Sequence, residues 1–179
     1  MVYVFLADGF EEIEALTPID CLRRCGVEVK TVGVGKLEIT GAHKITVRAD
    51  IMDNEIVLDN QLEMIVLPGG MPGTLNLAAS QNVQKAIKYC YENKAIIGAI
   101  CAAPSILGES GYLEHKQATC FPGYEDKLIG AEYTGNKVTV DDNIITARGA
   151  GVSLDFSFEL ITQLIGKSYS KELENKLQC

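Results

Sequence analysis

Short apolar segments alternate with longer segments of helical periodicity along the chain. The apolar segments predict strands, because residues buried on both faces of a sheet show no regular polar alternation. We expect strands at 2–7, 27–34, 63–67 and 95–100, and hairpins that pair 37–40 with 44–48 and 137–140 with 144–147. We expect helices at about 11–25, 81–93, 102–107 and 153–165, and a polar helix after Gly166.

This alternation of strands and helices predicts the class of fold. Apolar strands separated by helices form a mostly parallel sheet with helices on both faces, so we expect an α/β protein. No linker, repeat or low-complexity segment interrupts the pattern, which favours one domain over 1–179. Ligands of such folds bind at the carboxyl ends of the strands. Three such ends are of interest here, namely Asp8-Gly9, Gly69-Gly70 and Cys101.

Composition excludes several classes of protein. Apolar residues make up 47% of the chain and charged residues 22%, which is typical of a soluble globular protein. The net charge of −8 argues against nucleic acid or an anionic membrane as partner. The apolar runs are too short to span a membrane, and the first residues predict a strand rather than a signal peptide. We therefore expect a cytoplasmic protein.

Neither a metal nor a cofactor is expected. The chain has six cysteines, but a core of this size needs no disulfides, and His43 and His115 are not at ligand spacing from a cysteine pair. No G-x-G-x-x-G motif follows the first strand, and the Gly166-Lys167-Ser168 sequence lacks the leading glycine of a P-loop. The acidic pairs Glu11-Glu12 and Asp141-Asp142 are interpreted as solvated faces and turns.

Cys101 has the sequence context of a nucleophile elbow. It follows an apolar strand, has alanines at 99 and 103, and leads directly into a helix. Such a tight turn exposes one side chain and tolerates only small neighbours. The helix amides would lower the pKa of this thiol below its usual value. The alternative is a small core residue at the end of a strand, and the spacing leaves both open.

Two further features converge on the same edge of the sheet. Gly70 and Ala102 can offer backbone amides to a developing oxyanion, although Gly69-Gly70 also fits a plain turn. Glu14 lies on the flank of the first helix, beside the face formed by Ala15, Leu16, Ile19 and Leu22. The pattern alone favours a surface glutamate, whereas a carboxyl beside a buried thiol would have a raised pKa and could shuttle a proton.

Four segments resemble the ThiJ/PfpI superfamily, and most closely the branch of the parkinsonism-associated protein deglycase and its bacterial relatives. They are Asp8-Gly9-Phe10-Glu11-Glu12-Ile13-Glu14, Leu67-Pro68-Gly69-Gly70, Ala99-Ile100-Cys101-Ala102-Ala103-Pro104 and Arg148-Gly149-Ala150-Gly151. The resemblance covers essentially the whole chain. It implies a flavodoxin-like three-layer sandwich, similar to class I glutamine amidotransferases, and a homodimer. It also implies that Cys101 is the nucleophile, Glu14 its protonated partner, and Gly70 and Ala102 the amide donors.

Two departures from the superfamily pattern matter. Peptidases of the PfpI type have histidine directly after the cysteine, and Ala102 at that position argues against a Cys-His peptidase. Some members of the deglycase branch have histidine where Phe121 stands in Thr119-Cys120-Phe121-Pro122, so an imidazole base is missing there. Cys120 is either a core residue or a second redox thiol, and His115 is expected on a solvated loop.

The resemblance leaves three functions open. The first is a cysteine-dependent glyoxalase or protein deglycase that acts on α-oxoaldehydes or their protein adducts through the Cys101 thiolate and Glu14. The second is a non-enzymatic oxidative-stress sensor or chaperone in which Cys101 is oxidised to sulfinate. The third is a protein of undefined activity under the thiazole-phosphate-biosynthesis name used in this superfamily. The expected partners are a small carbonyl compound or a modified protein.

Overall fold

Seven strands form the central sheet of the computed structural model, which describes residues 1–179, in the order β10-β11-β7-β6-β1-β2-β5. Their bounds are β1 (Val2–Leu6), β2 (Val29–Gly33), β5 (Ile51–Met52), β6 (Met64–Leu67), β7 (Ile96–Ile100), β10 (Val138–Asp141) and β11 (Ile144–Ala147). Every neighbouring pair is parallel except β10 with β11, which form an antiparallel hairpin. The prediction of a mostly parallel sheet is confirmed.

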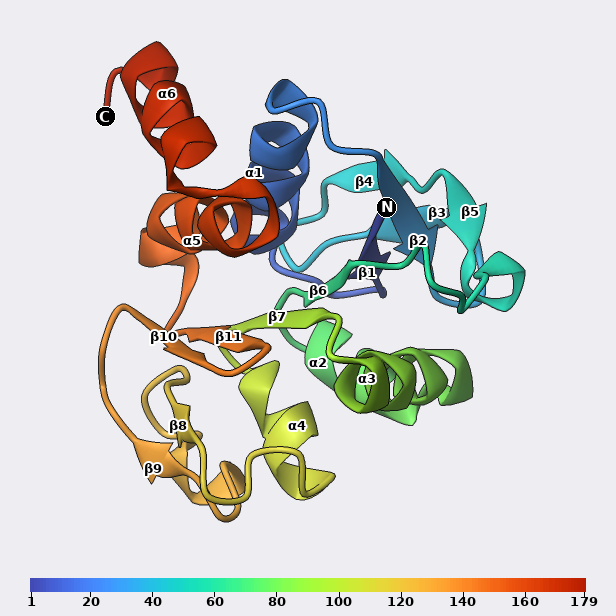
Figure 1. Cartoon of the computed structure of the whole chain (residues 1–179). Coiled ribbons are helices and arrows are strands. Elements are labelled where there is room, and N and C mark those ends of the chain that lie inside the picture. The colour runs from blue at the N-terminus through green and yellow to red at the C-terminus, as the bar shows by residue number, and fades with distance from the viewer.

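Helices cover both faces of this sheet, giving three layers (Figure 1). One face carries α1 (Glu12–Arg24), α5 (Ser153–Ile165) and α6 (Lys167–Leu177). The other face carries α2 (Gly73–Ala79), α3 (Gln81–Asn93) and α4 (Pro104–Glu109). This arrangement is the flavodoxin-like α/β sandwich that the resemblance to the superfamily implies.

Side-chain alternation along the strands divides the core between the two faces. In β1, Tyr3 and Phe5 pack on the side of α3, whereas Val4 and Leu6 pack on the side of α1 and α5. All four are almost completely buried. Burying a side chain of this size stabilises the fold by about 1.5–3 kcal/mol. A strand that is apolar on both faces therefore contributes side chains to both halves of the core.

Most predicted elements are present, and those that were missed are short. The helices expected at 81–93 and 153–165 have those bounds, and the hairpin of 37–40 with 44–48 corresponds to β3 (Glu38–Thr40) and β4 (Thr46–Arg48). The missed elements are α2, β5, β8 (Gln117–Ala118), β9 (Glu132–Tyr133) and the 3-10 turns η1 (Asp53–Glu55), η2 (Glu125–Lys127) and η3 (Ala150–Val152). Two or three residues cannot display a period, so the pattern gives no signal for most of these.

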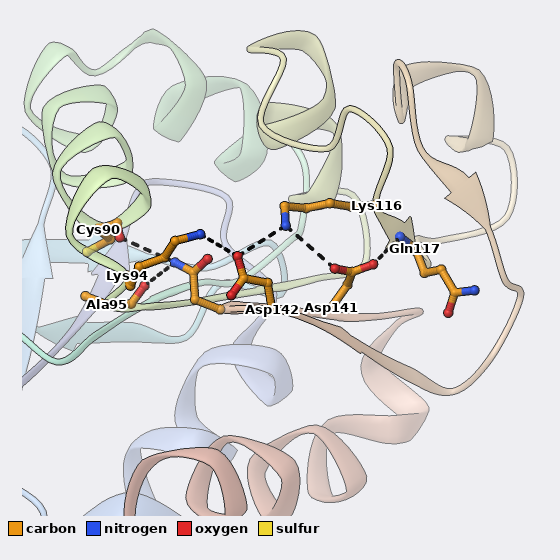
Figure 2. Close-up of polar contacts among 8 residues, drawn as sticks. Cys90, Lys94, Ala95, Lys116, Gln117, Asp141 and Asp142 are labelled. Carbon is orange, nitrogen blue, oxygen red and sulfur yellow. Dashed lines mark hydrogen bonds and ion pairs between the residues drawn. The ribbon is translucent and has the colours of Figure 1, made fainter.

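An ion-pair network fixes the β10–β11 turn to the loop that leads into β8 (Figure 2). Asp142 contacts Lys94 at 2.5 Å and Lys116 at 3.5 Å, while Asp141 lies 3.6 Å from Lys116. Asp141 also accepts a 2.8 Å hydrogen bond from the Gln117 amide. The acidic pair is thus part of a turn, as expected, but it also anchors the segment that continues to Phe121. No helix is both long and apolar enough to cross a membrane.

Candidate functional site

Cys101 occupies the sharp turn between β7 and α4. Its φ of +65° lies in the left-handed region, which non-glycine residues rarely adopt, and such backbone strain occurs often at functional sites. Its amide donates to the Ala147 carbonyl of β11 at 2.8 Å, and its carbonyl accepts from the Phe121 amide at 2.8 Å. Ala102 and Ala103 are buried directly behind it. The strand, turn and helix expected for an elbow are therefore present, and the thiol is only partly buried.

Glu14 is completely buried, which contradicts the surface position favoured by the pattern alone. Its Oε2 accepts a 2.8 Å hydrogen bond from the Gly69 amide, and its Oε1 has no protein partner. The carboxyl group lies beside Cys101, since both groups contact the same side of Gly69, and its charge raises the pKa of the thiol. The helix face was also assigned wrongly at Leu16, which is 36% exposed, because α1 turns Glu14 rather than Leu16 towards the sheet. An unpartnered carboxyl oxygen beside a thiol is suited to holding or moving a proton.

Gly69 and Gly70 bring the backbone close to this pair. A Cβ at Gly69 would lie 2.7 Å from both the Cys101 Cβ and the Glu14 Oε2. A side chain at this position would therefore push Cys101 and Glu14 out of their places. Gly70 has φ +90° and approaches the backbone of Glu11 too closely for a Cβ. The backbone amides of Gly70 and Ala102 both lower the pKa of the Cys101 thiol. The structure thus brings together all four residues that the sequence singles out for this site.

Burial is the largest influence on the pKa of both Glu14 and Cys101. Burial raises the pKa of Glu14 to about 7, against the opposing effect of its hydrogen bonds from Cys101 and Gly69. Burial, followed by the charge and hydrogen bond of Glu14, raises the pKa of Cys101 to about 12, although the Ala102 and Gly70 amides oppose this. The expected fall in the thiol pKa is therefore wrong, because that expectation considered the amides without the burial of the thiol, which is the larger effect, and without the Glu14 carboxylate. A proton on Glu14 removes the repulsion from that carboxylate.

A second polar cluster lies at the start of α1 and was not predicted. Glu12 is only 4% exposed, which corrects its assignment to a solvated face. Its Oε1 accepts from the amides of His43 and Ile45, and its Oε2 lies 3.0 Å from the His43 Nδ1. Hydrogen bonding to Glu12 raises the pKa of His43 above its ordinary value. The candidate ligand atoms of Glu11, Glu12 and His43 lie within 4.8 Å of one another, but the bonds from the loop already satisfy Glu12. A separation of 31 residues leaves no local sequence signal for this cluster.

Burial shows whether the other residues considered in the sequence belong to the core or to the surface. Cys120 is completely buried in the core on the α3 side, while Cys101 packs against the core on the α1 side, so Cys120 is a core residue. His115 is exposed, as expected. The Phe121 amide donates to the Cys101 carbonyl, and the Phe121 side chain is 47% exposed. A cavity of about 620 Å³ lies between β10, α5 and α6, and neither Cys101 nor Glu14 lines it.

The fold and the site define a class: α/β sandwich proteins with a cysteine at a strand-to-helix elbow and a buried carboxyl group beside it. Within that class, the chain belongs to the DJ-1/PfpI family, whose model matches residues 1–163.

Relatives and solved structures agree with this assignment. The chain is 31% identical to the Parkinson disease protein 7 homolog of Danio rerio, covering 97% of this chain and 94% of that protein. It is 35% identical to protein DJ-1 homolog B of Arabidopsis thaliana over 98% of this chain, which corresponds to 41% of the plant protein's length. It is 32% identical to a deglycase of Pyrococcus abyssi, over 84% of this chain and 90% of that protein.

Solved structures match along the whole chain. A mutant of a DJ-1 superfamily protein from Salmonella typhimurium superposes with a TM-score of 0.94 at 29% identity, covering 99% of this chain and 97% of that one. Oxidized DJ-1 of Toxoplasma gondii gives a TM-score of 0.91 at 30% identity, with coverage of 99% and 97%.

Proposed function

We propose that the protein is a glyoxalase or protein deglycase-like enzyme that acts on α-oxoaldehydes, or on their adducts with proteins, through Cys101 and Glu14. One observation carries the proposal: the buried Glu14 carboxyl has an unpartnered oxygen and lies beside the elbow cysteine, on the same side of Gly69. A carboxyl whose pKa is raised to about 7 can both accept and donate a proton at neutral pH. Kinship with a protein named a deglycase supports the same class of substrate.

The reaction begins with addition of the thiol to the aldehyde carbon. The S–C bond forms as the thiol proton passes through Glu14 to the aldehyde oxygen, and the product is a hemithioacetal. The Gly70 and Ala102 amides, which lower the pKa of the Cys101 thiol, would stabilise the negative charge that develops on that oxygen.

Glu14 then removes the proton from the former aldehyde carbon and returns it to the neighbouring carbon, while the hydroxyl proton of the hemithioacetal passes to the ketone oxygen. The hemithioacetal thus becomes a thioester, and the ketone becomes an alcohol, with no external oxidant. Water hydrolyses the thioester, which releases a 2-hydroxy acid and restores the Cys101 thiol.

Lactate formation from methylglyoxal tests this mechanism. We expect activity that disappears in Cys101→Ser and falls at least 100-fold in Glu14→Gln, since general acid–base catalysis contributes about 10²–10⁴-fold. In D₂O the lactate should carry deuterium at C2, because the proton on Glu14 exchanges with solvent. Turnover unchanged in either variant would exclude the assigned roles, and lactate without deuterium would exclude proton transfer through Glu14. Exposed Cys179→Ser is the matched control for loss of a thiol.

A second candidate function uses the same thiol as a sensor of peroxide. Two molecules of hydrogen peroxide would convert the Cys101 thiol to a sulfinic acid and release two molecules of water. A protonated Glu14 and the Gly70 and Ala102 amides would then donate to the sulfinate oxygens. Peptide mapping after mild peroxide treatment should show addition of two oxygens to Cys101 before the other five cysteines react. Indiscriminate oxidation would argue against a sensor.

We further propose that the protein forms a homodimer through α1 and the start of β4. Ile13 is 54% exposed and Ile45 53% exposed. The Ile45 amide donates to Glu12 of α1 at 3.3 Å, so the two apolar side chains belong to neighbouring segments of one surface. Light scattering should give twice the chain mass, and Ile13→Glu should give monomers. Val57→Glu, at an equally exposed site, should leave the dimer intact.

A further inference from the structure

Phe121 presents an exposed aromatic ring at the edge of the sheet that carries Cys101. Its amide donates to the Cys101 carbonyl at 2.8 Å, so its backbone lies directly beside the elbow. Its ring lies against Gly149, where a Cβ would come within 3.2 Å of the Phe121 Cδ2. Gly149 follows β11, and β11 is the parallel neighbour of β7, which ends at Cys101. The ring and the thiol are therefore at the same edge of the sheet.

The backbone on both sides of Phe121 is held in place. The Thr119 amide donates to the Thr146 hydroxyl of β11 at 2.9 Å, and both groups are buried. The Phe121 carbonyl accepts from the Tyr124 amide at 3.0 Å. Further upstream, Lys116 is anchored to the β10–β11 turn (Figure 2). An aromatic side chain on a fixed backbone offers contact area at a small cost in conformational entropy.

The groups that act directly on the thiol are polar. Gly70 and Ala102 face the thiol with backbone amides, and Glu14 faces it with a carboxyl group. A bound carbonyl compound would thus have its oxygen near the amides, and its substituent would need an apolar contact elsewhere. The Phe121 ring, at 47% exposure, offers such a contact, and burial of apolar surface favours binding.

From this arrangement we infer that Phe121 is the specificity-determining residue of the Cys101 site and selects α-oxoaldehydes with an aromatic or bulky apolar substituent. This inference rests on the proposed function, because it names the class of substrate that the same site would accept. Phenylglyoxal should therefore be preferred over methylglyoxal.

Two assays test the selection, one with turnover and one without. The first compares kcat/KM for phenylglyoxal and methylglyoxal. The second compares the rate constants for alkylation of Cys101 by N-benzyl-iodoacetamide and by iodoacetamide, followed by intact mass and peptide mapping. Phe121→Ala should lower both ratios by about three- to tenfold, the range expected for loss of one aromatic contact. Phe121→Leu is the second variant, for use if Phe121→Ala is poorly folded. It keeps an apolar side chain without the aromatic ring, and its ratios should lie between those of the wild type and of Phe121→Ala.

Tyr169→Ala is the matched control, since Tyr169 is an exposed aromatic residue of α6 beside Met1, at the opposite end of the strands. It should leave both ratios unchanged. Unchanged ratios in Phe121→Ala would overturn the inference, including the case in which a second copy of the chain covers the ring. If neither aldehyde is turned over but the alkylation ratio falls, the proposed function fails while Phe121 still selects what reaches the thiol.

Discussion

Replacing Glu14 by glutamine removes the charge of this side chain and keeps its size and shape. The amide oxygen of glutamine can still accept the Gly69 hydrogen bond, but the negative charge beside the thiol disappears. That charge and its hydrogen bond are, after burial, the causes that raise the pKa of Cys101 from 9.0 to about 12. The Glu14→Gln variant should therefore have a more acidic thiol than the wild type, while it loses turnover.

The size of the effect follows from the contact between the two groups. Two unit charges ~4 Å apart interact by about 4 kcal/mol at an effective dielectric constant near 20, and solvent at a partly exposed thiol reduces this. Each 1.36 kcal/mol changes the thiolate fraction about tenfold when most of the thiol is protonated. We expect at least about tenfold faster alkylation of Cys101 at pH 8 in the variant.

The assay is the rate of iodoacetamide alkylation at Cys101 between pH 6 and 10, measured by peptide mapping. The control is Asp20→Asn, which removes a charge from the same helix at a carboxyl that pairs with Arg24 and affects neither Glu14 nor Cys101. An unchanged pH profile in Glu14→Gln, or an equal change in Asp20→Asn, would refute the electrostatic coupling of Glu14 to Cys101.

Three further predictions concern stability and titration. The folded protein holds the Glu14 proton up to about pH 7 whereas the unfolded chain releases it near 4.5, so stability should fall as pH rises between these values. Urea unfolding should show Glu14→Gln more stable than wild type by about 3 kcal/mol at pH 8, with the difference vanishing near pH 4.5. Gly69→Ala should destabilise the fold by about 1–3 kcal/mol and abolish turnover, whereas Gly151→Ala, whose Cβ would meet no atom, should change neither; melting curves and lactate assays decide this. His43 should titrate above 6.5 in NMR spectra, and Glu12→Gln should bring it back towards 6.5; an unchanged titration would contradict their pairing.

The elbow at Cys101 was predictable because its requirements are local. A strand, a reactive residue with small neighbours and a following helix all lie within a few positions, and the left-handed turn results from that sequence. The main strands were predictable for a similar reason, since a residue buried on either face of β1 must be apolar. The glycines at 69 and 70 could be identified as candidates because close approach of backbones requires glycine.

The protonation of the site depends on contacts between segments that are distant in the chain. Glu14 meets the Gly69 amide across 55 positions, and Glu12 meets His43 across 31. Helical periodicity cannot report such contacts, because it describes one helix and not what packs against it. The pattern therefore assigned Glu14 and Glu12 to the surface, although both are buried.

The amino-acid sequence was sufficient for the layers of the fold and for the four residues that the structure brings together at the elbow. It was insufficient for the pKa of Cys101, because that value depends on burial and on a carboxylate brought in by another helix. It was also insufficient for the exposed ring of Phe121, whose place beside Cys101 depends on hydrogen bonds between three separate segments. Local propensities set the elements, while long-range packing sets the electrostatic surroundings of the thiol.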